Sequence, residues 1–501
     1  MKKQYTILIL IFILTLAFRL YFVFQSPNFD YEAYFNVRQI NQIIKTGFPL
    51  LTDNLSYGGR SIIFIPFIHY ILAFFSLILT AGIALKLLPN IAASSIVIIV
   101  YLIAKKLTKK ENISLITAFI SAFIPIYIIE TINSVSVYSI TLPLMFLVIY
   151  FLMELEKESS PYLKYLIILI ILLPFIHSSV FILTFSLIIY LILIKLAHLK
   201  QNKAELELIL FSIFLTFWIE FIIFKNAFLA HGPSVIWQNV PSIISTFYFI
   251  PTNFIEAVFR IGLIPLIGGI YVIYRYLFRE KNKPIYLLIS FAAASAILLW
   301  LKLIQPNITL AILGIVLTIL FAKYYQLAFL YIKKTRVAGY KKILFAVLIL
   351  IFILTSVLPC IYFTSERIRS AVSSEEIKAL LWLKTNTPTK STVLGPLSYG
   401  HIITAVANRK NVIDSNFLLI QLPEQHIEDV ETIYTSLYKT EAVRLLNEYS
   451  VDYIIFSPKI ADEFNIEDIK YIDDEECFEL VYDNNIKIYE SLCKLEEIKY
   501  D

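Results

Sequence analysis

The sequence predicts a polytopic α-helical membrane protein of about 11 to 13 helices with a C-terminal extracytoplasmic α/β domain. Composition supports this first: the 501 residues are 58% hydrophobic and 16% charged, with a mean hydropathy of +0.74. Apolar runs repeatedly reach about 18 residues, roughly the length that crosses a bilayer as a helix. Charge supports it too, because residues 364–501 hold 14 Lys and Arg against 25 Asp and Glu, and residues 1–363 hold 29 against 13. We therefore expect a basic membrane domain at 1–363, an acidic soluble domain at 364–501, and no nucleic-acid partner.

The N-terminus, Met-Lys-Lys followed by an apolar segment up to Phe24, has the pattern of a signal sequence. No small-residue cleavage site follows, and Arg19 lies within a long apolar core. A retained signal anchor is therefore expected, in a chain that crosses the cell membrane many times.

Clusters of Lys and Arg orient the helices, because positively charged short loops stay in the cytoplasm. Lys2 and Lys3 place the N-terminus inside and the first loop, residues 25–61, outside. Five further clusters are predicted to be cytoplasmic: 105–110, 154–164, 195–203, 275–283 and 333–342. With this orientation the C-terminal domain lies outside the cytoplasm.

About eleven crossings satisfy this orientation. They are predicted at residues 5–24, 83–104, 113–129, 138–153, 163–175, 178–196, 206–224, 254–276, 284–302, 308–330 and 342–362. Residues 61–80 are predicted to be a re-entrant or surface-lying helix, since a crossing there would put the 105–110 cluster outside. The outer loop 225–253 is long and nearly uncharged, as expected of a lid that faces a lipid-like substrate.

The tail carries a different pattern. Ser373-x-x-Glu376 is a capping box that begins a helix, and Pro388 ends it. Further elements are predicted as a strand at 392–394, a helix at 401–407, a strand at 412–414, a helix at 441–448 and a strand at 452–456. Of the three cysteines, Cys477 and Cys493 allow at most one disulfide, and no metal-ligand spacing is present.

The first loop concentrates polar residues beside a membrane helix. Apolar positions from Ala33 to Ile44 follow helical spacing and Gly47 ends the pattern, which predicts a short amphipathic helix. Asp30 precedes this helix as an N-cap, whereas Glu32 is not well explained by capping. A carboxylate at membrane level can act as a general base or a metal ligand.

Two stretches carry a family resemblance. Asp30-Tyr-Glu32-Ala-Tyr34-Phe35-Asn36-Val-Arg38 resembles Glu-Phe-Asp-Pro-Trp-Phe-Asn-Tyr-Arg in the catalytic subunit of oligosaccharyltransferases, which belong to the C-class of membrane glycosyltransferases. In the tail, Leu397-Ser-Tyr399-Gly400-His401-Ile, followed by Ala407-Asn-Arg409 and Asp414-Ser-Asn416, is similar to that family's Trp-Trp-Asp-Tyr-Gly acceptor motif and the residues after it.

The resemblance implies roles for these residues. Glu32 falls on the family's catalytic Asp and Asp30 on its Glu, so the two carboxylates are exchanged. Tyr399, Gly400 and His401 fall on the acceptor side, without the Trp-Trp-Asp that precedes them in the family.

The family's second acidic pair is absent here. It would fall on Val137 and Ser139, and only Glu130 is available nearby, so the metal is unknown and Mg²⁺ or Mn²⁺ is left open. These departures favour chemistry similar to that of protein O-mannosyltransferases and lipid A aminoarabinose transferases, which take one sugar from a polyprenyl phosphate.

The leaving phosphate needs a cation. Arg260, at the outer end of a predicted span, is the leading candidate and Arg60 the second; the alternatives are snorkelling for Arg260 and a loop-holding role for Arg60. Glu130 and His177 are predicted to be neighbours of the site or metal ligands. The alternatives are that Glu130 is an ordinary acid at the membrane interface and that His177 is a packed, hydrogen-bonded histidine.

We therefore expect a glycosyltransferase that moves a sugar from a polyprenyl- or dolichyl-phosphate-linked donor to a protein, lipid or glycan acceptor on the outer membrane face. Membrane lipids are the other expected partner. Oligosaccharyltransferase-like protein N-glycosylation is one alternative. A lipid-linked glycan transporter or an inactive glycan-binding scaffold is the other, because a fold does not imply an activity.

Overall fold

The computed structural model describes residues 2–155, 161–244, 253–335 and 339–494. Parts of the predicted lid loop and of two predicted cytoplasmic clusters lie outside them, at 245–252, 156–160 and 336–338. The chain divides into two compact units. The first comprises Met1–Ser26, Ile65–Phe224 and Tyr248–Arg369; the second comprises Pro27–Phe64, Lys225–Phe247 and Ser370–Asp501. The first loop, which was predicted to belong to the membrane domain at 1–363, thus lies in the same compact unit as the tail.

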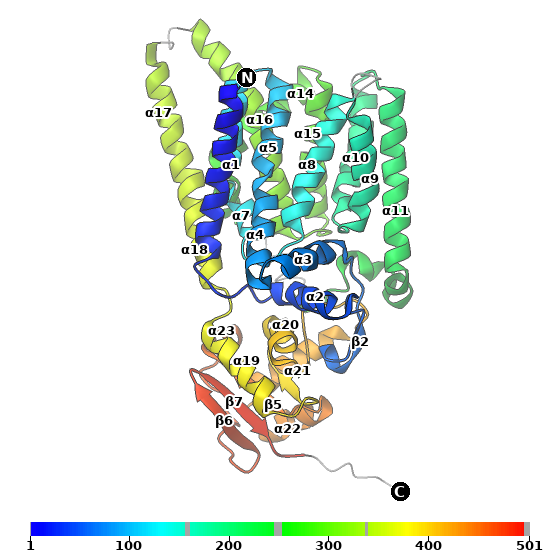
Figure 1. Cartoon of the computed structure of the whole chain (residues 1–501), viewed down its shortest axis with the longest axis vertical. Helices are drawn as coiled ribbons and strands as arrows, with labels where there is room; N and C mark the ends of the chain where they lie inside the picture. Colours follow the sequence, from blue (N-terminus) through cyan, green and yellow to red (C-terminus); the bar gives the residue numbers. More distant parts are fainter. Residues whose placement is uncertain (1, 156–160, 245–252, 336–338, 495–501) are drawn as a thin grey trace. The chain divides into compact units, whose positions relative to one another are not determined.

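The first unit is a helical bundle (Figure 1). Its helices are α1 (Lys2–Val23), α3 (Phe67–Ile78), α4 (Ala81–Ser94), α5 (Ile96–Thr108), α6 (Glu111–Ser121), α7 (Pro125–Thr131), α8 (Tyr138–Glu154), α9 (Leu163–Leu172), α10 (Val180–Leu196), α11 (Lys203–His231, of which the residues from Lys225 on belong to the second unit), α13 (Phe254–Ile261), α14 (Leu263–Phe278), α15 (Lys283–Trp300), α16 (Pro306–Lys334), α17 (Lys341–Phe352) and α18 (Leu358–Arg369). The central one is α16, which packs against α5, α6, α7, α14 and α15.

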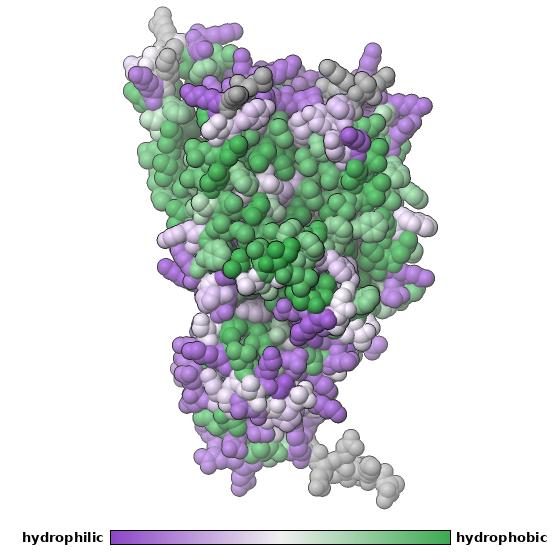
Figure 2. All heavy atoms as spheres, viewed as in Figure 1, coloured by the Kyte–Doolittle hydropathy of each residue, from purple (hydrophilic) through white to green (hydrophobic). Residues whose placement is uncertain are grey.

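Apolar side chains cover the flank of this bundle, and polar side chains gather at the end that carries the N-terminus (Figure 2). In the described residues, six helices are long and apolar enough to cross a membrane, or up to eight if each of two bent pairs is one span. Five further apolar helices are shorter. The chain is thus a mostly helical protein with several candidate spans, and the predicted count of 11 to 13 is not confirmed.

Two predicted spans are broken. The span predicted at 254–276 is two helices, α13 and α14, bent by 95°. The break falls at Gly262, whose φ of +99° is a conformation that glycine adopts without a Cβ penalty. The span predicted at 113–129 is α6 and α7, bent by 53°. Hydropathy alone missed both bends, because apolar residues continue across them.

Two other segments differ in extent from the predictions. The helix predicted at 61–80 is only α3, which lies crosswise to the long helices of its unit in Figure 1. The span predicted at 206–224 lies within α11, which continues to His231, so the first part of the predicted lid loop is helical. A 3₁₀ turn at Gly232–Trp237 follows it.

Two buried cations in the first unit are satisfied by hydrogen bonds. The Arg19 guanidinium, 1% exposed, donates to Asn90 Oδ1 at 2.9 Å and Thr131 Oγ1 at 2.5 Å. Lys86 donates to the carbonyls of Val23 and Ser26 just after α1. A charge in an apolar bundle is costly unless paired in this way, so both residues fix α1 to its neighbours.

The second unit contains a mixed five-stranded sheet in the order β4-β3-β5-β7-β6. The strands are β3 (Thr392–Leu394), β4 (Lys410–Asn411), β5 (Tyr453–Phe456), β6 (Phe478–Asn484) and β7 (Ile486–Ser491). β3 is parallel to β4 and β5, and β7 is antiparallel to β5 and β6. Its helices are α2 (Ala33–Thr46), α19 (Ser374–Asn386), α20 (Gly400–Ile402), α21 (Pro423–Thr435), α22 (Lys439–Glu448) and α23 (Pro458–Phe464). The first loop adds a hairpin of β1 (Thr52–Asp53) and β2 (Arg60–Ser61).

The predicted α/β character of the tail holds in this unit. The capping box is present, with Ser373 and Glu376 each bonding the other's backbone. The strand predicted at 412–414 lies instead at 410–411. The β6–β7 hairpin, α21 and α23 were not predicted.

A disulfide joins Cys477 and Cys493 across the base of the β6–β7 hairpin. This is the one bridge that the cysteine spacing allowed. Disulfides persist mainly in oxidising compartments, which favours the prediction that this unit lies outside the cytoplasm.

The orientation is tested by cysteine labelling at two exposed positions. Because Thr108 is only 3% exposed, Lys110→Cys is the better probe of the 105–110 cluster, and Ser374→Cys probes the tail. We expect a membrane-impermeant maleimide to label intact cells at 374 and only permeabilised cells at 110. Labelling of both from the same side would contradict the orientation.

Candidate functional site

The first loop places Glu32 at the start of a helix. α2 begins at Ala33 and ends at Gly47, which adopts φ +78°, as predicted. The N-cap is Glu32, without a side-chain capping bond, so the prediction that Asp30 is the cap is wrong. Asp30 is buried at 4% exposure, and its carbonyl accepts from Ala33 N–H at 3.1 Å. Glu32 is left free of a capping role, with its side chain 60% exposed.

The tail supplies the partners of Glu32. Ser415 Oγ donates to Glu32 Oε2 at 2.7 Å, and the same hydroxyl lies 3.0 Å from His401 Nε2. His401 Nε2 is 3.9 Å from Glu32 Oε2, and its ring packs against Phe35 with centroids 5.3 Å apart. Glu32 Oε1 accepts no hydrogen bond from the described residues and is open to a proton donor. We call Glu32, His401 and Ser415, together with Asp414, the loop–tail site.

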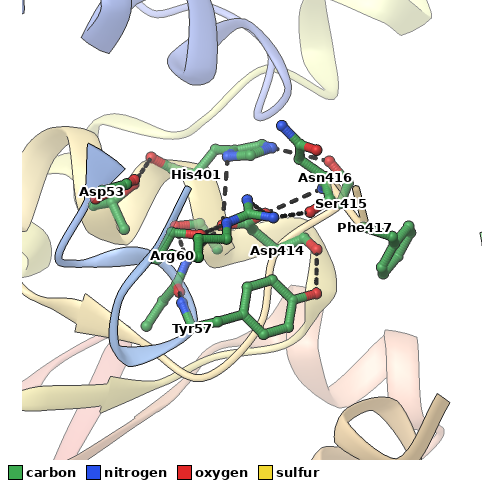
Figure 3. A network of polar contacts seen from close by, with 12 residues as sticks. Asp53, Tyr57, Arg60, His401, Asp414, Ser415, Asn416 and Phe417 are labelled. Atoms are coloured by element: carbon green, nitrogen blue, oxygen red, sulfur yellow. Dashed lines mark hydrogen bonds and ion pairs between the residues drawn. The ribbon is translucent and has the colours of Figure 1, made fainter. Parts of the chain in front are cut away.

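Asp414 is the most deeply buried member of this site. It is 1% exposed, and Figure 3 shows Arg60 and His401 turned toward it. Asp414 Oδ1 accepts from Arg60 at 2.8 Å, and Oδ2 accepts from Ser56 Oγ at 2.6 Å and Asn411 Nδ2 at 3.2 Å. Burial disfavours its charge, but His401 and Arg60, helped by the Ser56 hydrogen bond, outweigh burial and hold the pKa of Asp414 below its ordinary value.

A small cavity of about 10 Å³ lies in this unit, with His401, Asp414, Arg38 and Asp53 in its wall. That volume accommodates about one water molecule. His401 Nδ1 is 4.0 Å from Asp414 Oδ2, which is too long for a direct hydrogen bond. A water in the cavity can therefore couple the two side chains.

Tyr399 is buried and holds the tail motif in place. The Tyr399 hydroxyl donates to Glu376 and lies 2.8 Å from Ser457 Oγ. Glu376 also accepts from Tyr31 Oη at 2.5 Å. Burial and the Glu376 carboxylate raise the pKa of both tyrosines well above its ordinary value, so both hydroxyls remain donors. Of the predicted acceptor motif, His401 is the residue that contacts Ser415 and lies near Glu32, although it is itself buried.

Gly400 explains how His401 reaches Asp414. A Cβ at position 400 would lie 2.1 Å from Ile413 O and 2.4 Å from Asp414 Cβ. The chain at α20 thus approaches the 413–414 segment more closely than any side chain permits.

Gly400→Ala is therefore expected to destabilise the second unit by about 1–3 kcal/mol or more through overpacking. A thermal melt of the purified protein measures this. Gly82→Ala is the matched control, since a Cβ there meets nothing within 4 Å. Equal melting temperatures for the two variants would contradict the close approach.

Both arginines of the first loop are engaged within the second unit. Arg38 makes a bidentate pair with Asp53 at 2.5 and 2.7 Å. Arg60, 9% exposed, donates to Asp414 and to the Asn416 carbonyl and lies over the Tyr57 ring. Arg60 is thus held by an internal ion pair.

The remaining predicted site residues belong to the first unit. Arg260 lies on α13, where it pairs with Glu256 Oε1 at 2.6 Å and donates to Asn307 Oδ1 at 2.8 Å. Asn307 also hydrogen-bonds Glu130, and the Glu130 carboxylate interacts electrostatically with Arg260 and Arg367. His177 Nδ1 accepts from Ser179 N–H at 3.1 Å, and its ring packs edge-on against Tyr138.

Each unit, taken by itself, contains site residues that the sequence patterns do not single out. In the second unit, Ser415 stands out in the sequence only as part of the tail resemblance; in the first, Asn307 and Arg367 belong to no motif named above. The local sequence of Ser415 and Asn307 carries no signal, because each meets its partners across a long sequence separation. Arg367 carries one, since an arginine close to the end of an apolar span is costly unless it is paired.

The side chains that the structure describes do not form a metal site within either unit. In residues 2–155, 161–244, 253–335 and 339–494, no three His, Cys, Asp or Glu side chains converge so that they could hold a metal ion. Within the second unit, Asp30 is buried and Glu32 is bound by Ser415.

Comparison with curated proteins gives a local match. Over 136 residues the chain is 32% identical to dolichyl-phosphooligosaccharide-protein glycotransferase 2 of Archaeoglobus fulgidus. The match covers 25% of this chain and 23% of that protein, so less than a quarter of the relative is spanned. No family model matches the chain.

Solved structures match over nearly the whole chain. The apo oligosaccharyltransferase of A. fulgidus superimposes with a TM-score of 0.68 at 14% identity, covering 91% of this chain and 69% of that one. ArnT from Cupriavidus metallidurans, bound to undecaprenyl phosphate, gives 0.58 at 11% identity, with coverage of 96% and 98%. Mycobacterial arabinofuranosyltransferase AftD gives 0.55 at 10% identity, with coverage of 96% and 40%. The chain therefore has the fold of the GT-C membrane glycosyltransferases, the class that its first loop and tail resemble.

Proposed function

We propose that this protein is a glycosyltransferase that moves a sugar from a polyprenyl- or dolichyl-phosphate-linked donor to an acceptor on the outer membrane face. One observation carries the proposal. In a GT-C fold, the exposed Glu32 of the first loop meets His401 and Ser415 of the tail in one hydrogen-bonded site. An open carboxylate held by a hydroxyl is the arrangement that a general base requires.

The chemistry needs little from the protein beyond position and charge. The phosphate ester of the donor is already a leaving group, so the acceptor must be oriented and deprotonated. Glu32 Oε1 takes the acceptor proton while Ser415 holds Oε2, and in-line attack inverts the anomeric carbon. His401 Nε2 lies near Ser415 Oγ and Glu32 Oε2. His401 is proposed to face the acceptor, and Tyr399 and Gly400 are proposed to hold it in place.

Arg260 is proposed to bind the donor phosphate. Its Nε is buried and has no hydrogen-bond partner in the described part of the chain, so one donor remains for a ligand. Beside it, Glu256 and Phe259 of α13 line an open groove of about 470 Å³ whose other wall is apolar, from α18 and the turn before it. Such a groove suits a polyprenyl chain. Arg60 is a weaker candidate, because its pair with Asp414 is closed off at 4% and 1% side-chain exposure, whereas the pair of Arg260 with Glu256 is open at 20% and 39%. Glu130 and His177 are proposed as neighbours of the phosphate site.

Protein N-glycosylation is the second candidate, and the 136-residue match to an archaeal glycotransferase favours it. The two candidate functions differ in the sugar donor and the acceptor, and both use Glu32 as the general base. A transporter or an inactive scaffold would share the groove and the arginine but would transfer nothing.

Sugar incorporation separates these functions. Membranes with and without the protein are supplied with radiolabelled sugar on a polyprenyl monophosphate or a polyprenyl diphosphate. Label in protein or lipid fractions that depends on the protein supports transfer, and label at Asn residues from the diphosphate supports N-glycosylation. Incorporation no higher than in control membranes from every donor contradicts both.

Transfer is also expected to persist in excess EDTA, because the described carboxylates do not converge on a metal. The same incorporation assay with a chelator measures this. Loss of activity that Mn²⁺ or Mg²⁺ restores would contradict the expectation and would assign Glu130 to the place of the missing acidic pair.

A further inference from the structure

The chain carries three Asn-x-Ser/Thr sequences, at Asn54, Asn112 and Asn307. This is the sequence at which N-linked glycans are attached, to loops outside the cytoplasm. The motif alone is common by chance, so the surroundings of each asparagine must decide.

The structure separates the three. Asn307 is engaged, because its Oδ1 accepts from Arg260 at 2.8 Å. Asn112 is exposed at the start of α6, two residues after the 105–110 cluster that is predicted to be cytoplasmic. Asn54 is exposed in the turn of the β1–β2 hairpin, and in the described part of the chain nothing hydrogen-bonds its side chain. Only Asn54 combines an open amide with a predicted extracytoplasmic loop.

The serine of this sequence sets the time of modification. Ser56 is 1% exposed and its hydroxyl donates to Asp414, 358 residues later in the chain. In the folded unit that hydroxyl is closed to another enzyme. During synthesis at about 5–20 residues per second, the loop precedes Asp414 by roughly 20–70 s, which leaves the sequence accessible before the tail folds over it.

We propose that Asn54 is an N-glycosylation site of this protein, modified while the chain is being made. Asn54 Nδ2 forms a bond to the anomeric carbon of a glycan, the bond from that carbon to a lipid-linked phosphate breaks, and an amide proton leaves. The co-reactant is a polyprenyl-phosphate- or diphosphate-linked glycan, delivered by the oligosaccharyltransferase of the cell. The proposal does not depend on the activity of this chain, but it does depend on the predicted orientation.

Mass spectrometry tests it on full-length protein purified from membranes of the organism that encodes it. Trypsin releases residues 46–60, between Lys45 and Arg60, with Asn54 as the only asparagine. We expect this peptide to carry a glycan mass, with fragment ions placing it on Asn54. Asn54→Gln should remove the added mass. Ser56→Thr should retain it, because threonine keeps both the sequence requirement and a hydroxyl for Asp414.

Recovery of peptide 46–60 at its unmodified mass in full yield overturns the proposal. A glycan on Asn112 with none on Asn54 also overturns it, and reverses the orientation of the chain. Loss of the modification in Ser56→Thr would show that the added mass is not an N-linked glycan on this sequence.

Discussion

Glu32→Gln is expected to reduce glycosyl transfer by about 10²–10⁴-fold, the usual contribution of a general base. The amide cannot accept the acceptor's proton, yet it keeps the length of the side chain and an oxygen for Ser415 Oγ, now 2.7 Å from Glu32 Oε2. The residue is 60% exposed, so the fold should be retained. Initial rates of sugar incorporation, normalised to protein recovered from the membrane, give the result.

Glu375→Gln is the matched control. Glu375 is an exposed glutamate of the same unit, and its Oε2 accepts one hydrogen bond, from Asn485 Nδ2 at 2.6 Å. Its substitution should leave transfer unchanged. Equal activity of Glu32→Gln and the wild-type protein would remove Glu32 from the mechanism. An equal loss in both variants would point to stability rather than chemistry.

Asp414→Asn is expected to cost about 3–5 kcal/mol of stability in the second unit, as does removing one partner of a buried ion pair. Arg60 would keep its charge without a counter-ion on a side chain that is only 4% exposed, and an amide N–H₂ would face donors from Ser56 and Asn411. Thermal or protease-resistance midpoints of the purified protein report the loss. Glu448→Gln is the control, because its pair with Arg444 is exposed and contributes little.

The same pair predicts a pH dependence. Because the pKa of Asp414 is lowered in the folded protein, its ionised carboxylate stabilises the fold above its unfolded value of about 4, and this stabilisation is lost as pH falls through the lower folded value. Wild-type stability should therefore fall more steeply with acid than that of Asp414→Asn. Parallel acid profiles would contradict the assigned pairing.

Local signals predicted several elements correctly. The capping box at Ser373, the glycine stop at Gly47 and the strands near 392–394 and 452–456 all occur where expected. Each of these rests on residues within one or two turns of one another. The wrong N-cap at Asp30 shows the limit of such signals, because the chain turns at Asp30 and enters the helix only at Ala33.

The site itself could be predicted only in halves. Both the first loop and the tail motif were singled out, but the bond from Ser415 to Glu32 spans 383 residues and leaves no local trace. The ion pair of Arg60 with Asp414 is equally invisible in the sequence, because it spans 354 residues. The 95° bend at Gly262 was also hidden, because a glycine between apolar residues is compatible with a continuous span.

The most direct measurement uses purified full-length protein in liposomes, a radiolabelled polyprenyl-phosphate sugar, and a membrane extract as the source of acceptors. We predict that label moves from the donor into the extract with release of free polyprenyl phosphate, and that Glu32→Gln slows this release at least about 100-fold. A donor that stays intact with the wild-type protein, while still binding to it, would contradict the proposed transferase and leave a glycan-binding scaffold.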